Sequence, residues 1–348
     1  MVSDEALKGV GMELLTPMDL RYSDSLARGG VPMSDGVSPS ALSGLRRRWK
    51  RLRRVFYPLA VVPLEAWAKR IPEDKMEVWA RRFGQIAYWV STRARHRAHR
   101  HLHQAYGATF SSQRIKEISE ETFQNLALNF IECVRYSNGH KDELLERTSI
   151  DGWEHIEATH RAGRGGILLS GHIGNWELAA ASVALRGYPV GVVARQIYLS
   201  RLNLKLARMR ETMGVKTFYR DEPMRSMIRH LKNNGFIGVV ADQDIRSVSG
   251  IFVGFFGRPA YTPTGPALLA LASGSPILIS RDIRQGLSHR IVVDPPIYAD
   301  ATRPREDEVK RLVTLYTGRL EAFIRENPSH WVWSHRRWRT SPPTALED

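Results

Sequence analysis

The chain has 348 residues, of which 43% are hydrophobic, so it is long enough to bury one large core or two modest ones. Its one cysteine, Cys133, excludes an internal disulfide, and the apolar helical pattern around it favours a buried structural thiol over a nucleophile. The formal net charge of +15 favours anionic partners: nucleic acid, anionic lipid or an acidic protein.

Residues 1–44 are rich in Ser, Gly, Pro and Asp without a clear period, which is typical of a disordered tail. Residues 45–72 begin with clustered Lys and Arg and continue into a short apolar stretch, which favours a segment that associates with an anionic membrane surface. A solvated basic helix and a nucleic-acid-binding arm are the alternatives. The apolar stretch is too short for the roughly 18–20 residues that span a bilayer, so we expect peripheral or shallow attachment.

Residues 73–148 carry apolar side chains at spacings of three and four, which predicts a helical region packed on the core. A basic stretch within this region contains His96, His99, His101 and His103. Arginines are interleaved with these histidines and no Cys or Asp accompanies them, so a solvated or anion-facing helix is favoured over a metal site. No Gly-rich phosphate loop is present either, and we expect neither a metal nor a cofactor.

Between residues 149 and 340, short apolar runs alternate with helical patterns. The expected strands cover residues 165–170, 189–194, 215–219, 236–242, 275–280 and 289–297. The expected helices cover residues 175–187, 199–214, 223–235, 262–274 and 305–328. This alternation predicts an α/β core with a mixed, mostly parallel sheet flanked by helices, next to the N-terminal helical region. Active residues are expected where such strands end and helices begin.

One of these junctions, "GHIGNWE", places His172 and Glu177 five positions apart. On one helix the two side chains would point roughly 140° apart, so they can meet only if His172 precedes the helix. Gly171 and Gly174 permit the bend that this requires, and Asn175 is a good N-cap that puts Glu177 in the first turn. A carboxylate bonded to one imidazole nitrogen fixes the tautomer and makes the other nitrogen a general base.

The alternative interpretation of the pair is a capping Glu beside a His that hydrogen-bonds within its loop. Its place after a strand-like run favours catalysis. No G-x-S-x-G serine lies nearby, so a covalent serine route is not indicated. The remaining chemistry is direct deprotonation of an acceptor hydroxyl, which then attacks an activated acyl group.

The chain resembles the late acyltransferases of lipid A biosynthesis, the lauroyl/myristoyl type within the lysophospholipid acyltransferase superfamily. The resemblance runs from about residue 55 to residue 339. It is carried by five ordered blocks: "GHIGNWE", "VVARQIYLSRLNLKLARMRETMG", "GVVADQD", "VGFFGRPAYTPTGPALLALASGSPIL" and "NPSHWVWSHRRWR". The apolar N-terminal helix that anchors many members is interrupted here by two prolines and a glutamate.

The resemblance implies transfer of a fatty acyl chain from acyl carrier protein to a hydroxyl of a lipid A precursor, without a covalent acyl-enzyme. His172 would take the hydroxyl proton, Glu177 would orient His172, and Asp242 would steady His172 or an arginine. Backbone N–H groups near Gly171–Gly174, or an arginine, would stabilise the oxyanion. The resemblance also implies that the protein lies at the cytoplasmic face of the bacterial inner membrane.

The same resemblance nominates residues that bind substrate phosphates or polar groups: Asn175, Arg195, Arg210, Gln243 and Arg258. Each arginine also has an ordinary interpretation, as a surface residue, part of a solvated helix face or a turn residue. The stretch "GIFVGFFG" is either the wall of an acyl-chain tunnel or a buried strand.

Three rival functions remain. An acyltransferase of the same superfamily that acts on a glycerophospholipid or a phosphatidylinositol mannoside would share the His–Glu chemistry. A hydrolase would use water in place of the alcohol. A nucleic-acid-binding protein is disfavoured, because the chain lacks an RRM-like aromatic block, a zinc-finger pattern and a recognition-helix signature.

Overall fold

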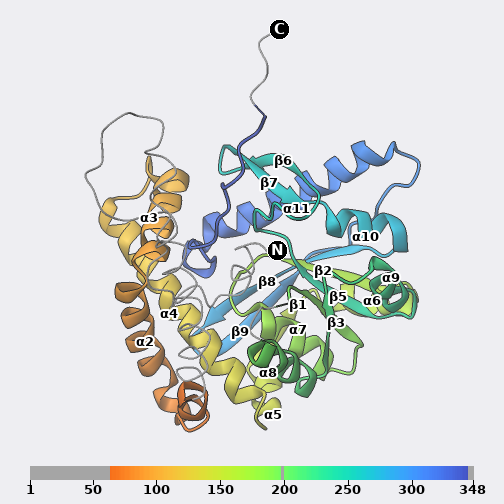
Figure 1. Ribbon diagram of the computed structural model, residues 1–348. Helices are drawn as coiled ribbons and strands as arrows, with labels where there is room; N and C mark the ends of the chain where they lie inside the picture. Colours follow the sequence, from red (N-terminus) through yellow and green to blue (C-terminus); the bar gives the residue numbers. More distant parts are fainter. Residues whose placement is uncertain (1–62, 197–199, 344–348) are drawn as a thin grey trace, which may run out of the picture.

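The structure, a computed structural model, describes residues 63–196 and 200–343 (Figure 1). The predicted tail, residues 1–44, and most of the predicted membrane-associating segment, residues 45–72, lie outside the described residues. Within that segment, residues 63–68 are helical. No helix of the described part of the chain combines the length and the apolar character that crossing a bilayer requires.

Three long helices of the N-terminal region, α2, α3 and α4, stand beside the central sheet at the left of Figure 1, and the short α5 lies at the bottom. Their bounds are Glu73–Lys75 (the 3-10 turn η3), Met76–Val90 (α2), Thr92–Tyr106 (α3), Ser112–Tyr136 (α4) and Lys141–Glu146 (α5). The helix α4 begins where the Ser111 hydroxyl accepts the backbone N–H of Arg114 at 3.2 Å. It presents buried side chains along most of its length, and α2 packs against it.

The histidine-rich stretch forms α3, and His101 differs from the solvated expectation. Its side chain is buried, and its Nδ1 lies 3.0 Å from the carbonyl oxygen of Trp333. Burial lowers the pKa of His101 to about 4, so the ring is neutral at physiological pH. His101 is therefore a packing residue that joins α3 to the C-terminal segment.

The described residues form a seven-stranded sheet with the order β1-β9-β8-β2-β5-β3-β4. The strands cover Thr148–Asp151 (β1), Gly166–Ser170 (β2), Val190–Ala194 (β3), Val215–Tyr219 (β4), Phe236–Val240 (β5), Ile277–Gln285 (β8) and Ser288–Val293 (β9). The five strands from β8 to β4 are parallel, whereas β9 is antiparallel to β8 and carries β1 parallel to itself. The predicted fold class, a mixed and mostly parallel sheet flanked by helices, is confirmed.

Helices cover both faces of the sheet because its central strands are apolar on both faces. On β2, Leu168 belongs to one buried cluster, whereas Ile167 and Leu169 belong to another. The first cluster includes side chains of Trp153–Arg161 (α6), Trp176–Leu185 (α7) and Ser200–Thr212 (α8). The second includes side chains of Met224–Lys232 (α9), Gly265–Ser273 (α10) and Arg305–Glu326 (α11).

A two-stranded hairpin that the sequence patterns did not predict connects β5 to α10. It consists of Gly250–Phe255 (β6) and Arg258–Pro263 (β7), paired antiparallel. The stretch "GIFVGFFG" is therefore a strand, and its Val253 and Phe255 side chains are buried. After α11, the short 3-10 turn η4 (Pro328–His330) leads into a C-terminal segment whose Trp331 and Trp333 are fully buried.

Neighbouring parallel strands end at the same edge of the sheet, so the residues that follow them lie together. His172 follows β2 and Asp242 follows β5, which is the next strand in the sheet. Arg195 follows β3 and Arg220 follows β4. The topology thus gathers a histidine, an aspartate and two arginines at one edge.

Close packing of α2 on α4 generates a stability prediction at Gly84. A Cβ at Gly84 would lie 2.7 Å from the backbone nitrogen of Gln124, so Gly84→Ala should push the helices apart and cost about 1–3 kcal/mol of unfolding free energy. Gly318 in α11 is exposed with open space around it, and Gly318→Ala should stabilise by up to about 1 kcal/mol. Urea unfolding measures both; equal effects at the two glycines would contradict the packing argument.

Candidate active site

The loop after β2 holds His172 outside the helix that carries Glu177. Gly174 has a φ of 57°, and a Cβ there would lie 2.5 Å from the Asp282 Oδ2, so only glycine fits. Ile173 pairs with Trp331 in an isolated bridge, which ties the loop to the C-terminal segment. The Asn175 side chain then caps α7 by accepting the Leu178 N–H at 3.3 Å. The predicted bend and N-cap are confirmed.

Asp242 is the carboxylate that holds His172. Its Oδ1 lies 2.7 Å from the His172 Nδ1, and its Oδ2 accepts the backbone N–H of His172, also at 2.7 Å. The indole Nε1 of Trp331 donates a third bond to Oδ2 at 2.7 Å. Both residues are buried, with 5% of His172 and 3% of Asp242 exposed. The expectation that Asp242 steadies His172 matches this geometry.

These contacts fix the tautomer of His172. Burial alone would raise the pKa of Asp242, but the attraction of His172 and the hydrogen bonds from its ring and backbone lower that pKa well below the ordinary value. An ionised carboxylate only accepts hydrogen bonds, so the Nδ1 of His172 carries a proton and donates it. In the neutral ring, the lone pair is then on the Nε2, which is the arrangement that a general base requires.

Glu177 has a different partner from the one that the sequence suggested. Arg210 of α8 binds both its oxygens, with Nε to Oε2 at 2.8 Å and Nη2 to Oε1 at 2.6 Å. Burial would raise the pKa of Glu177, but the charge and hydrogen bonds of Arg210 lower it. The bond that orients His172 therefore comes from Asp242, and the Glu177–Arg210 pair joins α7 to α8.

A second imidazole lies beside His172. The His335 ring meets the His172 ring edge-on, with centroids 4.5 Å apart. Burial, followed by repulsion from His172, lowers the pKa of His335 well below its ordinary value, so this ring is neutral. The Gln243 Nε2 lies 3.0 Å from the His335 Nδ1 and 3.4 Å from the His172 Nε2, and its amide therefore bridges the two rings.

His172, Asp242 and His335 bring three possible metal ligand atoms within 4.8 Å of one another. However, both oxygens of Asp242 already accept N–H bonds from His172 and Trp331. A metal ion would have to displace at least one of those bonds. The donor set therefore suits an oriented imidazole better than a metal centre.

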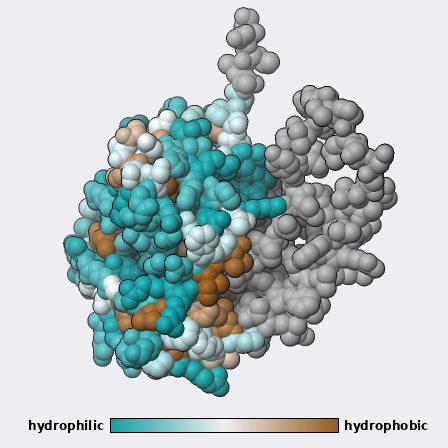
Figure 2. Space-filling view, turned by 90° about the vertical axis from the view of Figure 1, so that its left-hand side faces the viewer, coloured by the Kyte–Doolittle hydropathy of each residue, from teal (hydrophilic) through white to brown (hydrophobic). Residues whose placement is uncertain are grey.

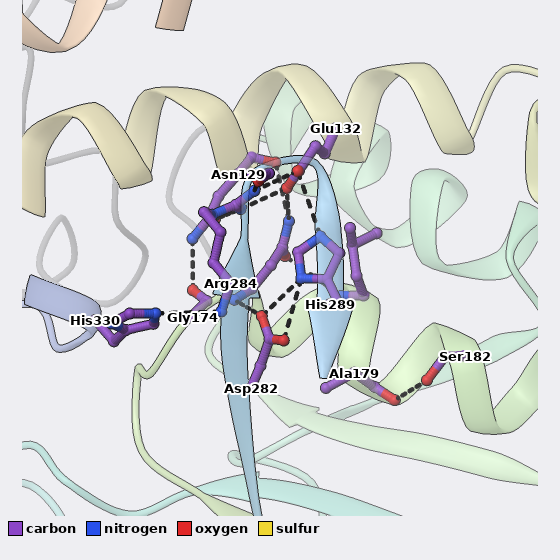
Figure 3. Close-up of polar contacts among 12 residues, drawn as sticks. Asn129, Glu132, Gly174, Ala179, Ser182, Asp282, Arg284, His289 and His330 are labelled. Carbon is purple, nitrogen blue, oxygen red and sulfur yellow. Dashed lines mark hydrogen bonds and ion pairs between the residues drawn. The ribbon is translucent and has the colours of Figure 1, made fainter. Parts of the chain in front are cut away.

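Behind the loop, α4 and the β8–β9 hairpin enclose a group of buried charged residues (Figure 3). The Arg284 guanidinium binds the Glu132 carboxylate at 2.5 and 2.6 Å. The His289 ring lies 2.9 Å from the Asp282 Oδ2 on one side and 3.3 Å from the Glu132 Oε1 on the other. We call Glu132, Asp282, Arg284 and His289 the buried charge cluster.

The buried charge cluster holds the loop that carries His172. The Asp282 Oδ2 accepts the backbone N–H of Asn175 at 2.6 Å, and the Asn175 amide donates to Glu132 at 2.9 Å. Asn129, which Arg284 also binds, donates to the carbonyl of Gly174 at 2.6 Å. Asn175 is thus bonded within the protein on all sides, which gives it a structural part in the site.

Both signs of charge are maintained within the buried charge cluster. Burial opposes ionisation of Glu132, but the charges and hydrogen bonds of Arg284 and His289 lower its pKa to about 2. Burial also opposes protonation of His289, but Asp282 and Glu132 raise its pKa to about 9. Two cations and two anions therefore balance at neutral pH, which is the condition under which buried charges are tolerated.

The backbone of the His172 loop leaves few donors for an oxyanion. The N–H of His172 donates to Asp242, that of Ile173 to the Gly171 carbonyl at 2.8 Å, and that of Gly174 to the His330 carbonyl at 2.9 Å. The expectation that backbone N–H groups near Gly171–Gly174 stabilise an oxyanion is therefore wrong for these three groups. The alternative that the sequence analysis gave, an arginine, remains, because Arg195 lines the cavity.

A mostly apolar cavity of about 400 Å³ opens beside His172. This volume lies within the range of about 300–1,000 Å³ that is usual for small-molecule sites. Of the residues predicted from sequence, His172, Glu177, Arg195, Arg210 and Gln243 line it. Asn175 does not contribute to the described lining, and neither does the exposed Arg258, which begins β7 in the hairpin.

Several residues around the site had no clear signal in the sequence. His335 stands in the C-terminal block, where the tryptophans drew attention to packing instead. Glu132 was the more detectable case, because a glutamate on the apolar face of a long helix needs a buried partner. Its partners Arg284 and His289 lie more than 150 positions away, so no local pattern identifies them.

The raised pKa of His289 predicts a loss of stability at alkaline pH. A histidine whose pKa rises from about 6.5 unfolded to about 9 folded contributes its full stabilisation below about pH 6.5 and loses it as pH rises through about 9. The loss should amount to about 3 kcal/mol of unfolding free energy.

Urea unfolding between pH 6 and 10 measures this loss in the wild type, with His289→Gln as the matched comparison. The variant should be less stable at pH 7 and should lack the drop. In Glu132→Gln the drop should move to lower pH, because one of the two carboxylates that raise the pKa is gone. A drop of the same size and position in all three proteins would contradict the assignment to His289.

Comparison with known proteins connects this site to a family. The model described as bacterial lipid A biosynthesis acyltransferase matches residues 47–340. The lipid A biosynthesis lauroyltransferase of Escherichia coli (strain K12) is 24% identical over 266 residues, which cover 74% of this chain and 83% of that protein.

Other relatives carry a different name. The phosphatidylinositol mannoside acyltransferase of Mycobacterium tuberculosis (strain CDC 1551 / Oshkosh) is 26% identical over 193 residues, which cover 54% of this chain and 59% of that protein. The match thus spans less than two thirds of the mycobacterial protein. The family model spans most of this chain and includes every element of the site, and the chain therefore belongs to the bacterial lipid A biosynthesis acyltransferase family.

Proposed function

We propose that this protein is an O-acyltransferase that moves a fatty acyl chain from acyl carrier protein to a hydroxyl of a lipid A precursor. The observation that carries the proposal is the buried Asp242–His172 pair, whose histidine lines a mostly apolar cavity. It provides an oriented base beside a space that suits an acyl chain. Family membership supports the same chemistry.

The reaction begins when the His172 Nε2 takes the proton of the acceptor hydroxyl. The alkoxide oxygen attacks the thioester carbonyl, forms a C–O bond and gives a tetrahedral oxyanion. When the oxyanion collapses, the C–S bond breaks and the thiolate takes the proton from His172. Asp242 stabilises the imidazolium between these steps, and no acyl-enzyme forms.

Side chains of the cavity lining provide the oxyanion donors in this mechanism. The Gln243 Nε2 lies 3.4 Å from the His172 Nε2 and 3.0 Å from the His335 Nδ1, so it would exchange one of these two contacts to donate to the oxyanion. Arg195 lines the same cavity and adds a positive charge. Both residues were predicted to bind substrate, and this proposal gives them a part in the transition state.

The charge of the chain supports the proposed partners. Acyl carrier protein and a phosphorylated lipid precursor are both acidic, and the net charge of +15 attracts them. We place the enzyme at the cytoplasmic face of the inner membrane, attached peripherally. Exposed apolar side chains on α2 support membrane contact: Val78, Ile86, Trp89 and Val90. Apolar surface is visible on the side of the molecule that Figure 2 shows.

The acyl chain would enter the part of the cavity between the sheet and α7. Leu168, Gly238 and Val192 are aligned on the neighbouring strands β2, β5 and β3, and all three line the cavity. Residues in register on parallel strands face the same side, so Gly238 leaves a gap between two apolar side chains. Ala180 and Val183 of α7 line the opposite wall.

Gly238 therefore predicts an effect on acyl-chain preference. A Cβ at this position would lie 3.0 Å from the Val192 Cγ1, and a valine would fill more of the gap. Gly238→Val should shift the preferred donor to a shorter acyl chain, with kcat/KM for the longest good substrate reduced by roughly tenfold or more. Transfer rates with a series of acyl carrier protein thioesters measure this. An unchanged order of preference would contradict the placement of the chain.

The second candidate is acyl transfer to a phosphatidylinositol mannoside or a glycerophospholipid. The observation that favours it is the 26% identity to mycobacterial phosphatidylinositol mannoside acyltransferase. The catalytic pair would act identically on that acceptor. Parallel assays with a lipid A precursor and with a phosphatidylinositol mannoside separate the two candidates, and each should be run with acyl carrier protein and coenzyme A thioesters.

The mechanism predicts distinct effects for the two carboxylates near His172. His172→Ala should abolish transfer, and Asp242→Asn should lower kcat by about 10²–10⁴ because the tautomer is lost. Glu177→Gln should chiefly reduce stability, because it leaves the buried Arg210 without its anion. Steady-state transfer and urea unfolding of each variant test this. Full transfer activity in His172→Ala would overturn the mechanism.

A further inference from the structure

A buried arginine of the C-terminal segment, Arg337, has no carboxylate bound to it among the described residues. Only 1% of Arg337 is exposed. Its Nη1 donates to the Tyr261 carbonyl at 2.8 Å and its Nη2 to the Thr262 hydroxyl at 2.7 Å, whereas its Nε has no hydrogen-bond partner. By contrast, Arg210 and Arg284 are each bound to a glutamate. A buried charge without a partner is costly, so the charge of Arg337 calls for a physical explanation.

The guanidinium of Arg337 remains charged at neutral pH. Burial lowers the pKa of Arg337 to about 10, and the attraction that opposes this effect comes first from Asp242 and then from Asp244. The helix α11 contributes Tyr316, whose pKa burial raises, and Glu321, which an arginine of the same helix binds. Asp242 is therefore the anion that favours the charge of Arg337 most.

Two aromatic rings connect Arg337 to Asp242. The guanidinium carbon lies 4.6 Å from the centroid of the Phe255 ring, and this ring meets the Trp331 ring edge-on with centroids 5.5 Å apart. The Trp331 indole in turn donates to the Asp242 Oδ2 at 2.7 Å. Both rings are fully buried, so water screens little of the attraction between the two charges at their ends.

Asp242 needs a counter-charge when His172 is ready to act as a base. In that state the imidazole is neutral, and the three donors that bind Asp242 are all uncharged N–H groups. The adjacent His335 ring is neutral because it is buried. Glu177 of α7 also acts on His172, but Arg210 already binds it. The unpaired arginine of the C-terminal segment is then the buried cation that compensates Asp242.

We propose that Arg337 is a positioning residue that acts through Asp242: its charge compensates the carboxylate and thereby keeps His172 in the neutral form that can take a proton. Protonation of His172 places two cations beside one anion, so Arg337 opposes it by repulsion. Without Arg337, protonation of His172 would be the remaining way to compensate Asp242. This inference rests on the proposed acyl transfer, in which His172 is the general base.

The pH dependence of transfer tests the charge of Arg337. Arg337→Gln should move the acid limb of the pH profile of kcat/KM to higher pH by about one unit, which lowers kcat/KM about tenfold at a pH below the limb. Arg337→Lys keeps the charge and should leave the limb in place. Thr262→Val removes the hydroxyl that Arg337 binds without changing any charge, and it should not move the limb either. An unmoved limb in Arg337→Gln, or the same shift in all three variants, would overturn the proposal.

An NMR titration of the His172 ring separates this inference from the proposed function, because it needs no substrate. The His172 signals are assigned by their loss in His172→Gln, and their titration midpoint should rise by about one pH unit in Arg337→Gln.

Arg337→Met, which is also neutral and fills the buried space with an apolar chain, should give the same shift and serves if Arg337→Gln does not fold. A midpoint that stays in place in the folded neutral variant would overturn the coupling even if His172-dependent transfer is found. A shifted midpoint in a protein without transfer activity would refute the proposed function and leave the coupling standing.

Discussion

The rest of the site depends on the carboxylate of Asp242. One oxygen orients the His172 ring, and the other accepts the His172 backbone N–H and the Trp331 indole N–H. One buried anion thereby ties β5, the loop after β2 and the C-terminal segment together. Because its three donors include the imidazole that would act as base, the interaction that closes this part of the fold also fixes the tautomer. Asp242 therefore has both a structural role and a role in the proposed mechanism.

A second constraint acts on the same loop from the opposite side. The buried charge cluster holds Asn175 through Asp282 and Glu132, and Asn175 is only three residues after His172, which Asp242 holds. The free energy of removing these charges from water offsets much of the attraction between them, so such a cluster adds little net stability to the fold. Its bonds to the loop fix the backbone around Gly174, which lies between His172 and the helix α7.

Features that depend on residues close together in the sequence could be predicted from local sequence patterns. The ends of β2, β3 and β4, the glycine bend and the Asn175 cap follow from spacing and residue type, and the structure confirms them. The predicted ends of β8 and β9 were wrong, because β8 continues to Gln285 and β9 ends at Val293. The partner of Glu177 was mispredicted because Arg210 lies on another helix, 33 positions away, and no local spacing encodes that contact. Asp242 was found through a resemblance between blocks, since 70 positions separate it from His172. The β6–β7 hairpin was missed because its apolar run indicates a strand without indicating a partner.

The cavity combines two environments that a single hydrocarbon ligand does not need. Its α7 side is apolar, with a gap at Gly238, whereas its rim carries arginines. An amphiphile with a hydrocarbon chain and a nearby phosphate satisfies both. The division of the cavity is therefore compatible with the amphiphilic substrates of the proposed acyl transfer.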